Sequence, residues 1–171
     1  MTSQSLANKS VAMLVCSGFT EAGFIALHKA LVGASAKLTI VSRDSGLING
    51  WSDNGWGLSW PADQAMNETL AVDFDMLVIP DGSRHSELVK NDAHGRRIIN
   101  AFLREEMPAL VLGSGIDLLE AFDLAENRNI SREAVCRDGT LVTAGADADI
   151  ASLLDSLGAA VNEYSQNAAA A

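Results

Sequence analysis

Three short apolar runs, each stopped by small or turn-forming residues, restrict the fold of this chain more than any other feature of its sequence. They are Val11–Cys16 before Ser17-Gly18, Phe74–Pro80 before Asp81-Gly82, and Ala109–Leu112 before Gly113-Ser114-Gly115. Mostly apolar runs of this length are typical of strands that are buried on both faces of a parallel sheet. Two further strands are predicted over residues 36–42 and 140–143.

Helical segments separate the predicted strands. Residues 20–32 carry apolar side chains at helical spacing, with Thr20 as the N-cap and Gly33 as the C-cap. Further helices are predicted over residues 91–105, from Gly115 through Phe122, and over residues 147–162. Strands that alternate with helices form right-handed βαβ units, which pack into a parallel sheet covered on both faces. We therefore predict an α/β protein, a three-layer sandwich with a mainly parallel, flavodoxin-like sheet.

Residues 44–61 interrupt this alternation. Glycine and asparagine recur through the segment, and Trp51, Trp56 and Trp60 lie among them. Such a density of turn-forming residues predicts a small hairpin outside the main sheet. The three tryptophans form either an exposed aromatic patch, of the kind that anchors interfaces, or a local core packed over the sheet edge.

Length and charge bound the organisation and the partners. The chain has 171 residues, the size of a single domain, and we expect residues 1–9 and 165–171 to be flexible. Its 12 basic and 22 acidic residues give a net charge of −10, so binding to nucleic acid or to a membrane surface is not expected. No apolar run approaches the ~18 residues of a membrane span, and the polar start is unlike a secretion signal. These features predict a cytoplasmic protein.

Neither the cysteines nor the glycines form a recognisable cofactor motif. Cys16 and Cys136 are far apart and lack the spacing of a metal site or of a disulfide framework. The glycines of residues 44–61 are not followed by Gly-Lys-Ser/Thr, so they do not form a phosphate loop. We therefore expect no metal and no cofactor.

The carboxyl ends of the strands are the predicted ligand site, because parallel strands place these ends at one edge of the sheet. A carboxylate, a cation and an imidazole follow the strand at residues 74–80, and a hydroxyl follows the next strand. The predicted ligand-binding residues are Asp81, Gly82, Arg84, His85 and Ser114. The alternative is a solvated loop at residues 81–85 that only caps the following helix.

Four segments resemble the ThiJ/PfpI superfamily, which has a glutamine-amidotransferase-like fold. VAMLVCSGFTEAGF resembles its first strand and turn, and DFDMLVIPDG resembles a strand that usually ends in Pro-Gly-Gly. ALVLGSGIDLLEAFDL resembles its nucleophile-elbow segment, and DGTLVTAG resembles a late strand. The segments follow in the family's order over most of residues 11–150. The resemblance implies this fold and an association into homodimers or higher homo-oligomers.

The same resemblance places glycine at both positions on which the family's chemistry depends. The family nucleophile is a Cys at a tight strand-to-helix turn, and the matching residue is Gly113. The family's acidic partner matches Gly23, although Glu21 lies two residues away. Of the two glycines that follow the proline in the family, Asp81 replaces the first and Gly82 retains the second. The resemblance therefore implies a non-catalytic domain with a structural, oligomerising or small-ligand-binding role.

Within the superfamily, the segment Gly113–Leu119 resembles the C-terminal domain of large-subunit catalases, whose elbow is also degenerate. This resemblance implies a stress-related accessory role as a further hypothesis.

An enzyme with a shifted site is the alternative function. In it, Cys16 is the nucleophile or a redox-sensitive thiol, and Glu21 and His85 are acid–base groups of a hydrolase or lyase; otherwise Cys16 is a buried apolar side chain. Ser114 lacks the Gly-x-Ser-x-Gly pattern because Leu112 stands two residues before it. A helix N-cap is therefore the predicted role of Ser114, in preference to nucleophile.

Overall fold

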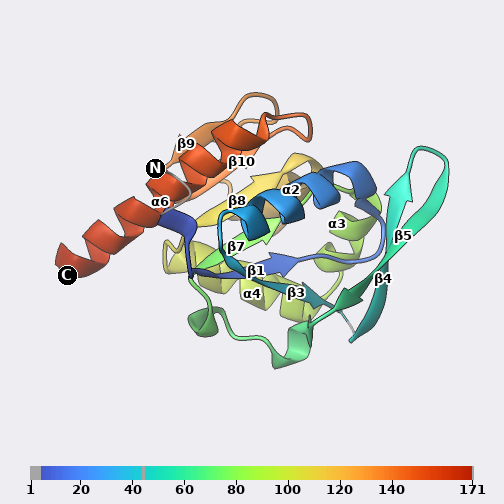
Figure 1. Cartoon of the computed structure of the whole chain (residues 1–171). Coiled ribbons are helices and arrows are strands. Elements are labelled where there is room, and N and C mark those ends of the chain that lie inside the picture. The colour runs from blue at the N-terminus through green and yellow to red at the C-terminus, as the bar shows by residue number, and fades with distance from the viewer. Residues whose placement is uncertain (1–4, 44, 171) are drawn as a thin grey trace.

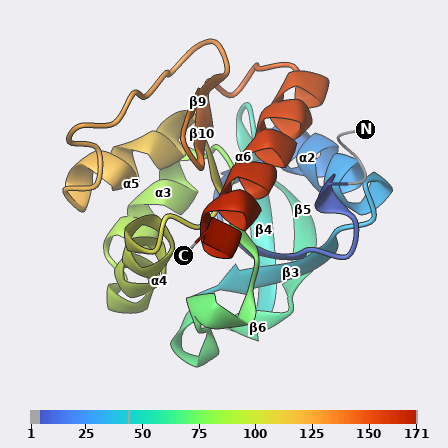
Figure 2. The ribbon, with the colours of Figure 1, turned by 90° about the vertical axis from the view of Figure 1, so that its left-hand side faces the viewer.

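A computed structural model describes residues 5–43 and 45–170, and it places a seven-stranded sheet between two layers of helices (Figure 1; Figure 2). The strands are β1 Ser10–Leu14, β3 Lys37–Ser42, β6 Gln64–Ala65, β7 Met76–Ile79, β8 Ala109–Leu112, β9 Cys136–Asp138 and β10 Leu141–Ala144. The helices are α2 Glu21–Gly33, α3 Ser83–Lys90, α4 Ala93–Arg104, α5 Ile116–Ala121 and α6 Ile150–Ala170. Short 3-10 turns are η1 Met66–Glu68, η2 Ala71–Asp73 and η3 Gly113–Gly115.

The strand order of this sheet is β6-β3-β1-β7-β8-β10-β9; among its described strand pairs, β9–β10 is antiparallel and the others are parallel. The central strands β3-β1-β7-β8-β10 thus have the 2-1-3-4-5 order of flavodoxin-like sheets. The predicted fold class is confirmed. The order reverses beside β1, so β1 and β7 flank a switch point, the usual place for ligands in such sheets.

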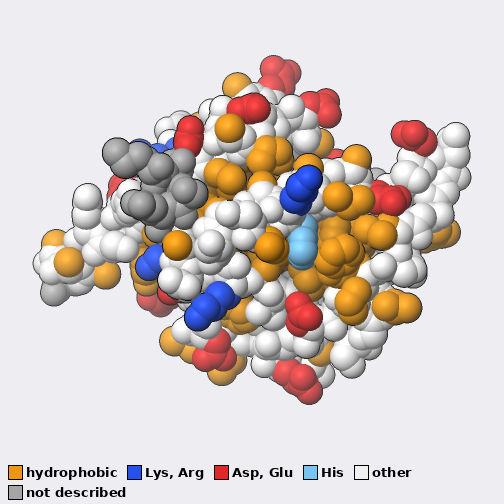
Figure 3. All heavy atoms as spheres, in the orientation of Figure 1, with side chains coloured by type: hydrophobic (Ala, Val, Ile, Leu, Met, Phe, Trp, Pro, Cys, Tyr) orange, Lys and Arg blue, Asp and Glu red, His pale blue; other side chains and the backbone are white. Residues whose placement is uncertain are grey.

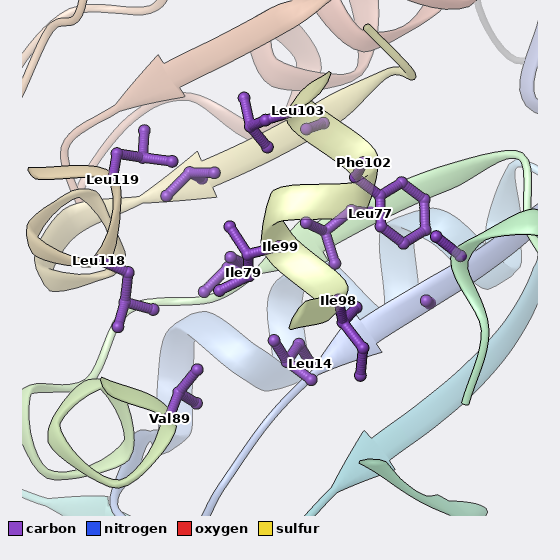
Figure 4. Close-up of a cluster of buried hydrophobic side chains, with 14 of the residues drawn as sticks. Leu14, Leu77, Ile79, Val89, Ile98, Ile99, Phe102, Leu103, Leu118 and Leu119 are labelled. Carbon is purple, nitrogen blue, oxygen red and sulfur yellow. The ribbon is translucent and has the colours of Figure 1, made fainter. Parts of the chain in front are cut away.

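Both faces of the sheet are covered because alternate residues of each strand point to opposite sides. Val11 and Met13 of β1 belong to the core formed with α2 and α6, whereas Ala12 and Leu14 belong to the core formed with α3, α4 and α5. Figure 4 shows the second core, where Ile99 of α4 lies over the sheet near Ile79 and Leu77. Two separate apolar cores therefore fix the helices on the sheet.

The predicted hairpin at residues 44–61 is present, with Asp44 outside the described residues. It comprises β4 Gly46–Ser52 and β5 Gly55–Ala62, and it forms a second, three-stranded sheet with β2 Phe19–Thr20. Trp60 packs edge-on against Phe24 of α2, with ring centroids 5.3 Å apart, and so belongs to the local core. Trp56 remains 57% exposed. The tryptophans therefore divide between the two predicted roles.

Several predicted boundaries were wrong. Residues 83–90 form helix α3 rather than a loop, because His85, Ser86 and Val89 lie on one helical face that is buried. Helix α2 has Ala34 as its C-cap in place of Gly33. Helix α6 continues to Ala170 rather than ending near residue 162, as its alanine-rich end favours helix. Leu6, in the segment expected to be flexible, is fully buried.

No helix of the described residues is long and apolar enough to cross a membrane.

Candidate functional site

The turn that the resemblance matches to the family's elbow lies where β8 continues through η3 into α5. Gly113 occupies this turn in the left-handed region, with φ of +53°. A Cβ atom built on Gly113 would collide with Oδ1 of Asp81 and lie 2.6 Å from its carboxyl carbon. The Asp81 carboxylate therefore occupies the volume into which an elbow side chain would extend.

Hydrogen bonds hold the Asp81 carboxylate in this position. Its Oδ1 accepts a hydrogen bond from the backbone N–H of Ser114 at 2.9 Å, and its Oδ2 accepts one from the Thr20 hydroxyl at 3.0 Å. Thr20 precedes α2 as predicted, but its hydroxyl makes no capping bond to that helix because it is bonded to Asp81. The carboxylate thus connects the segments after β1, β7 and β8.

Ser114 binds the next segment instead of capping its own helix. Its Oγ accepts a hydrogen bond from the backbone N–H of Gly82 at 3.0 Å and lies 3.1 Å from Oγ of Ser86. The residue at the N-cap of α5 is Gly115, without a side-chain capping bond, so the predicted N-cap role was wrong. The prediction failed because Ser114 lies inside η3, where the Ser114 hydroxyl contacts Gly82 just before α3.

His85 is fully buried and uses both ring nitrogens. Nδ1 accepts a hydrogen bond from the backbone N–H of Cys16 at 3.0 Å, and Nε2 donates one to the Pro80 carbonyl at 2.9 Å. A carbonyl only accepts and an amide only donates, so these partners require the neutral ring with its proton on Nε2. Burial lowers the pKa of His85 to about 4. The hydrogen bond to Pro80 and the nearby Asp81 charge raise this pKa, but their effect is smaller than that of burial. His85 therefore joins the ends of β1 and β7.

Cys16 contacts His85 through its backbone N–H, whereas the side chains of Cys16 and Glu21 have other surroundings. Burial raises the pKa of the Cys16 thiol to about 11, and hydrogen bonds from the Arg43 backbone and Ser42 side chain offset only part of this effect. The Glu21 carboxylate lies against Gly57 of the hairpin. A Cβ on Gly23, which the resemblance assigns to the position of the family's acid, would meet nothing within 4 Å. Among the described residues, no hydrogen bond joins the side chains of Cys16, Glu21 and His85 to one another.

Arg84 is the predicted ligand-binding residue that remains exposed at the sheet edge. Its guanidinium carbon lies 4.1 Å from the ring centroid of Trp51 and 5.7 Å from that of Trp56. This contact is not visible in the sequence, because Trp51 and Arg84 are far apart in the chain and the folded hairpin brings them together. Within the described residues, no group of three or more His, Cys, Asp or Glu side chains is arranged to hold a metal ion.

The sequence model of the DJ-1/PfpI family matches residues 9–147, most of the chain. A three-layer α/β protein with an elbow after β8 is the class that the geometry defines, and the chain belongs to the DJ-1/PfpI family. No curated protein sequence matches the chain.

Solved structures of the same fold include a two-domain protein from Anabaena variabilis with DJ-1/ThiJ/PfpI-like and ferritin-like domains. That protein has a TM-score of 0.81 and 20% identity over 91% of this chain, which spans only 48% of its length. A ThiJ/PfpI domain protein from Brachyspira murdochii has a TM-score of 0.73 and 21% identity, covering 94% of this chain and 98% of its own. DJ-1beta of Drosophila melanogaster has a TM-score of 0.73 and 15% identity, covering 95% and 98%. At these identities the likeness extends to the fold.

Proposed function

We propose that this chain is a non-catalytic DJ-1/PfpI protein with a structural, oligomerising or small-ligand-binding role. The observation that carries this proposal is the Asp81 carboxylate, which fills the elbow above Gly113 and is bonded there by Ser114 and Thr20. A nucleophile at this turn needs both a side chain and free space for the substrate's reacting atom. Neither is provided by this arrangement.

The alternative, a hydrolase or lyase with a shifted site, has less support. A thiol with a raised pKa is a weak nucleophile at neutral pH. The ring nitrogens of His85 are already bonded to backbone groups, and Glu21 lies against the hairpin. These three side chains therefore lack the mutual contacts that nucleophile activation requires.

An accessory role in the cytoplasm, as a homodimer or higher homo-oligomer, extends the proposal. The catalase-type elbow at Gly113–Leu119 favours a stress-related setting, and the Anabaena protein provides a precedent for a domain of this fold beside a second domain. Light scattering that gives the 18.0 kDa mass of one chain would count against the oligomer. Failure to co-purify with a haem protein from its own cells would count against the catalase-like role.

Restoring the missing thiol tests the non-catalytic proposal. The purified protein is expected to show no substantial glyoxalase, amidase or peptidase turnover. The double variant Asp81→Gly/Gly113→Cys is expected to fold and to add one iodoacetamide-reactive thiol, because removing the carboxylate frees the elbow. Gly113→Cys alone is expected to lower the Tm strongly, since its side chain meets Asp81.

Gly139→Cys is the matched control for Gly113→Cys. Gly139 has a similar φ of +61°, but a Cβ there meets nothing within 4 Å, so this variant bears only the backbone strain of about 1–2 kcal/mol. Equal Tm losses in the two single variants would contradict the filled elbow. Substantial turnover by the unaltered protein would overturn the non-catalytic proposal itself.

A further inference from the structure

A cavity lies at the carboxyl edge of the sheet, beside the elbow but separate from it. Its lining residues are Ser17, Trp56, Ser83, Arg84, Glu87 and Leu88. Ser17 follows β1 and Ser83 begins the helix after β7, so the cavity opens at the switch point between these strands. Ligands of open α/β sheets bind at such points. Neither Gly113 nor Asp81 belongs to its lining.

The Arg84 guanidinium lies at this cavity over an aromatic ring, and no carboxylate of residues 5–43 or 45–170 is paired with it. It stacks over Trp51 at 4.1 Å, and it makes no hydrogen bond or ion pair with any residue that the structure describes. Glu87 lies three residues later on α3, a spacing that allows an ion pair. Instead, its Oε1 accepts a hydrogen bond from the Asn91 side chain at 3.3 Å. The donor edge of Arg84 therefore remains available.

The cavity also has an apolar wall, to which Trp56 and Leu88 contribute. Trp56 packs edge-on against Trp51 with ring centroids 5.0 Å apart, yet 57% of its surface stays exposed. Leu88 packs against the core formed with α3, α4 and α5, and its side chain contributes to the same wall. The hairpin projects from the body (Figure 1), and apolar side chains also gather on the face where it meets α2 (Figure 3), although no residue of α2 belongs to the cavity lining. The aromatic wall and the cation thus belong to one fixed arrangement.

We propose that this cavity binds a small organic carboxylate with a flat apolar body. The planar guanidinium presents parallel N–H donors that match a carboxylate in a bidentate pair. The apolar body of the ligand lies against Trp56 and Leu88, as in other pockets with an apolar lining and few polar groups. The proposal deepens the ligand-binding role proposed above and rests on it, but it involves none of the elbow residues.

Phenylacetate is the test ligand, with phenylacetamide and benzylamine as its neutral and cationic counterparts. The experiment is a titration of the full ¹⁵N-labelled chain, followed by NMR at the tryptophan indole N–H signals. Phenylacetate is expected to shift the Trp56 and Trp51 signals saturably, with at least tenfold higher affinity than phenylacetamide. Absence of saturable shifts, equal binding of the amide, or preferred binding of benzylamine would each overturn the proposal.

Two variants connect this binding to the named residues. Arg84→Gln is expected to weaken phenylacetate binding at least tenfold, whereas Arg96→Gln is expected to leave it unchanged. Arg96 is the matched control, an arginine at 5.4 Å over the Phe122 ring and outside the cavity. Unchanged affinity in Arg84→Gln would overturn the proposal.

Glu87→Gln is expected to raise the affinity for phenylacetate, an effect that misfolding of the variant would not produce. Removing this carboxylate from the lining is expected to tighten phenylacetate binding severalfold, because it removes a like charge near the ligand. Weaker binding in Glu87→Gln would overturn the anionic assignment. The turnover assays of the elbow are separate measurements, so failure of ligand binding and failure of the non-catalytic proposal are distinguishable.

Discussion

At the scale of single residues, His85 shows how a candidate acid–base group becomes part of the framework. It lies in the first turn of α3, and its ring joins the backbone of Cys16 to that of Pro80. Two strand ends are therefore held together by one neutral imidazole. Protonating this ring would place a charge in a fully buried site and remove the acceptor for the Cys16 N–H.

This arrangement predicts a loss of stability in acid. The pKa of His85 is about 4 in the folded chain, below its ordinary value of 6.5, so the unfolded state binds more protons between these values. Stability therefore falls as the pH drops from 6.5 to 4, by up to about 3 kcal/mol from this residue. Chemical denaturation of the wild-type chain and of His85→Gln across this range measures the difference, because an amide also provides one acceptor and one donor.

The other titrating groups are common to both proteins and cancel in that comparison. A wild-type stability that changes with pH in parallel with that of His85→Gln would contradict the assignment of the neutral ring.

At single residues, the sequence supports a prediction where a position in a linear motif is enough. The resemblance assigns Gly113 and Gly23 to the family's nucleophile and acid positions because both are defined places in a linear pattern, and these assignments stay predictions. It could not identify the filling of the elbow by Asp81, since that depends on the relative position of β7 and β8. The position of His85 after a strand end led to its prediction as a ligand-binding residue, but its full burial could not be predicted, because the depth of a side chain depends on the packing around it.

At the scale of elements, apolar strands were predictable and the short polar helix was not. Buried strands carry their signal in composition, so β1, β7 and β8 were found near their true bounds. Helix α3 begins Ser-Arg-His-Ser-Glu, and its buried face includes His85 and Ser86 rather than a run of apolar residues. A pattern method interprets such a segment as a loop. Tertiary contacts at the end of β7 provide the missing stabilisation.

Arg97 connects helix α4 to the segment that contains η1. Its two terminal nitrogens donate hydrogen bonds to the backbone carbonyls of Thr69 and Met66, at 2.9 and 3.0 Å. Replacing Arg97 by Met is expected to cost about 2 kcal/mol, because two charge-assisted bonds are lost. It is also expected to accelerate hydrogen exchange in residues 66–73, which these bonds hold against the helix.

Arg104→Met on the same helix is the control for Arg97→Met. The Arg104 side chain makes no hydrogen bond to any residue that the structure describes. A loss of stability in Arg104→Met as large as that in Arg97→Met would contradict the role of the two carbonyl bonds.

At the scale of the whole molecule, helix α6 completes the layer that covers one face of the sheet. Leu153, Leu157 and Val161 of α6 belong to the same core as α2 and alternate residues of the strands. Beyond Tyr164, the residues up to Ala170 are exposed, and the end of the helix extends past the body of the protein (Figure 1; Figure 2). The helix therefore has a structural part and an end that contributes little to the core.

Truncation separates these two parts. A chain that ends after Tyr164 is expected to keep its Tm within a few degrees, because the side chains of residues 165–170 are exposed and the removed segment is uncharged. A chain that ends after Ser156 loses the buried side chains of Leu157, Ala160 and Val161. Burial of each larger side chain contributes roughly 1.5–3 kcal/mol. The combined loss is a large share of a typical total stability of about 5–15 kcal/mol. We expect it not to fold, and Leu157→Ala in the full chain to cost about 2–5 kcal/mol. Circular dichroism melting curves measure all three, and a strong loss of Tm on removing residues 165–171 alone would show that the exposed end takes part in a contact that the single chain does not contain.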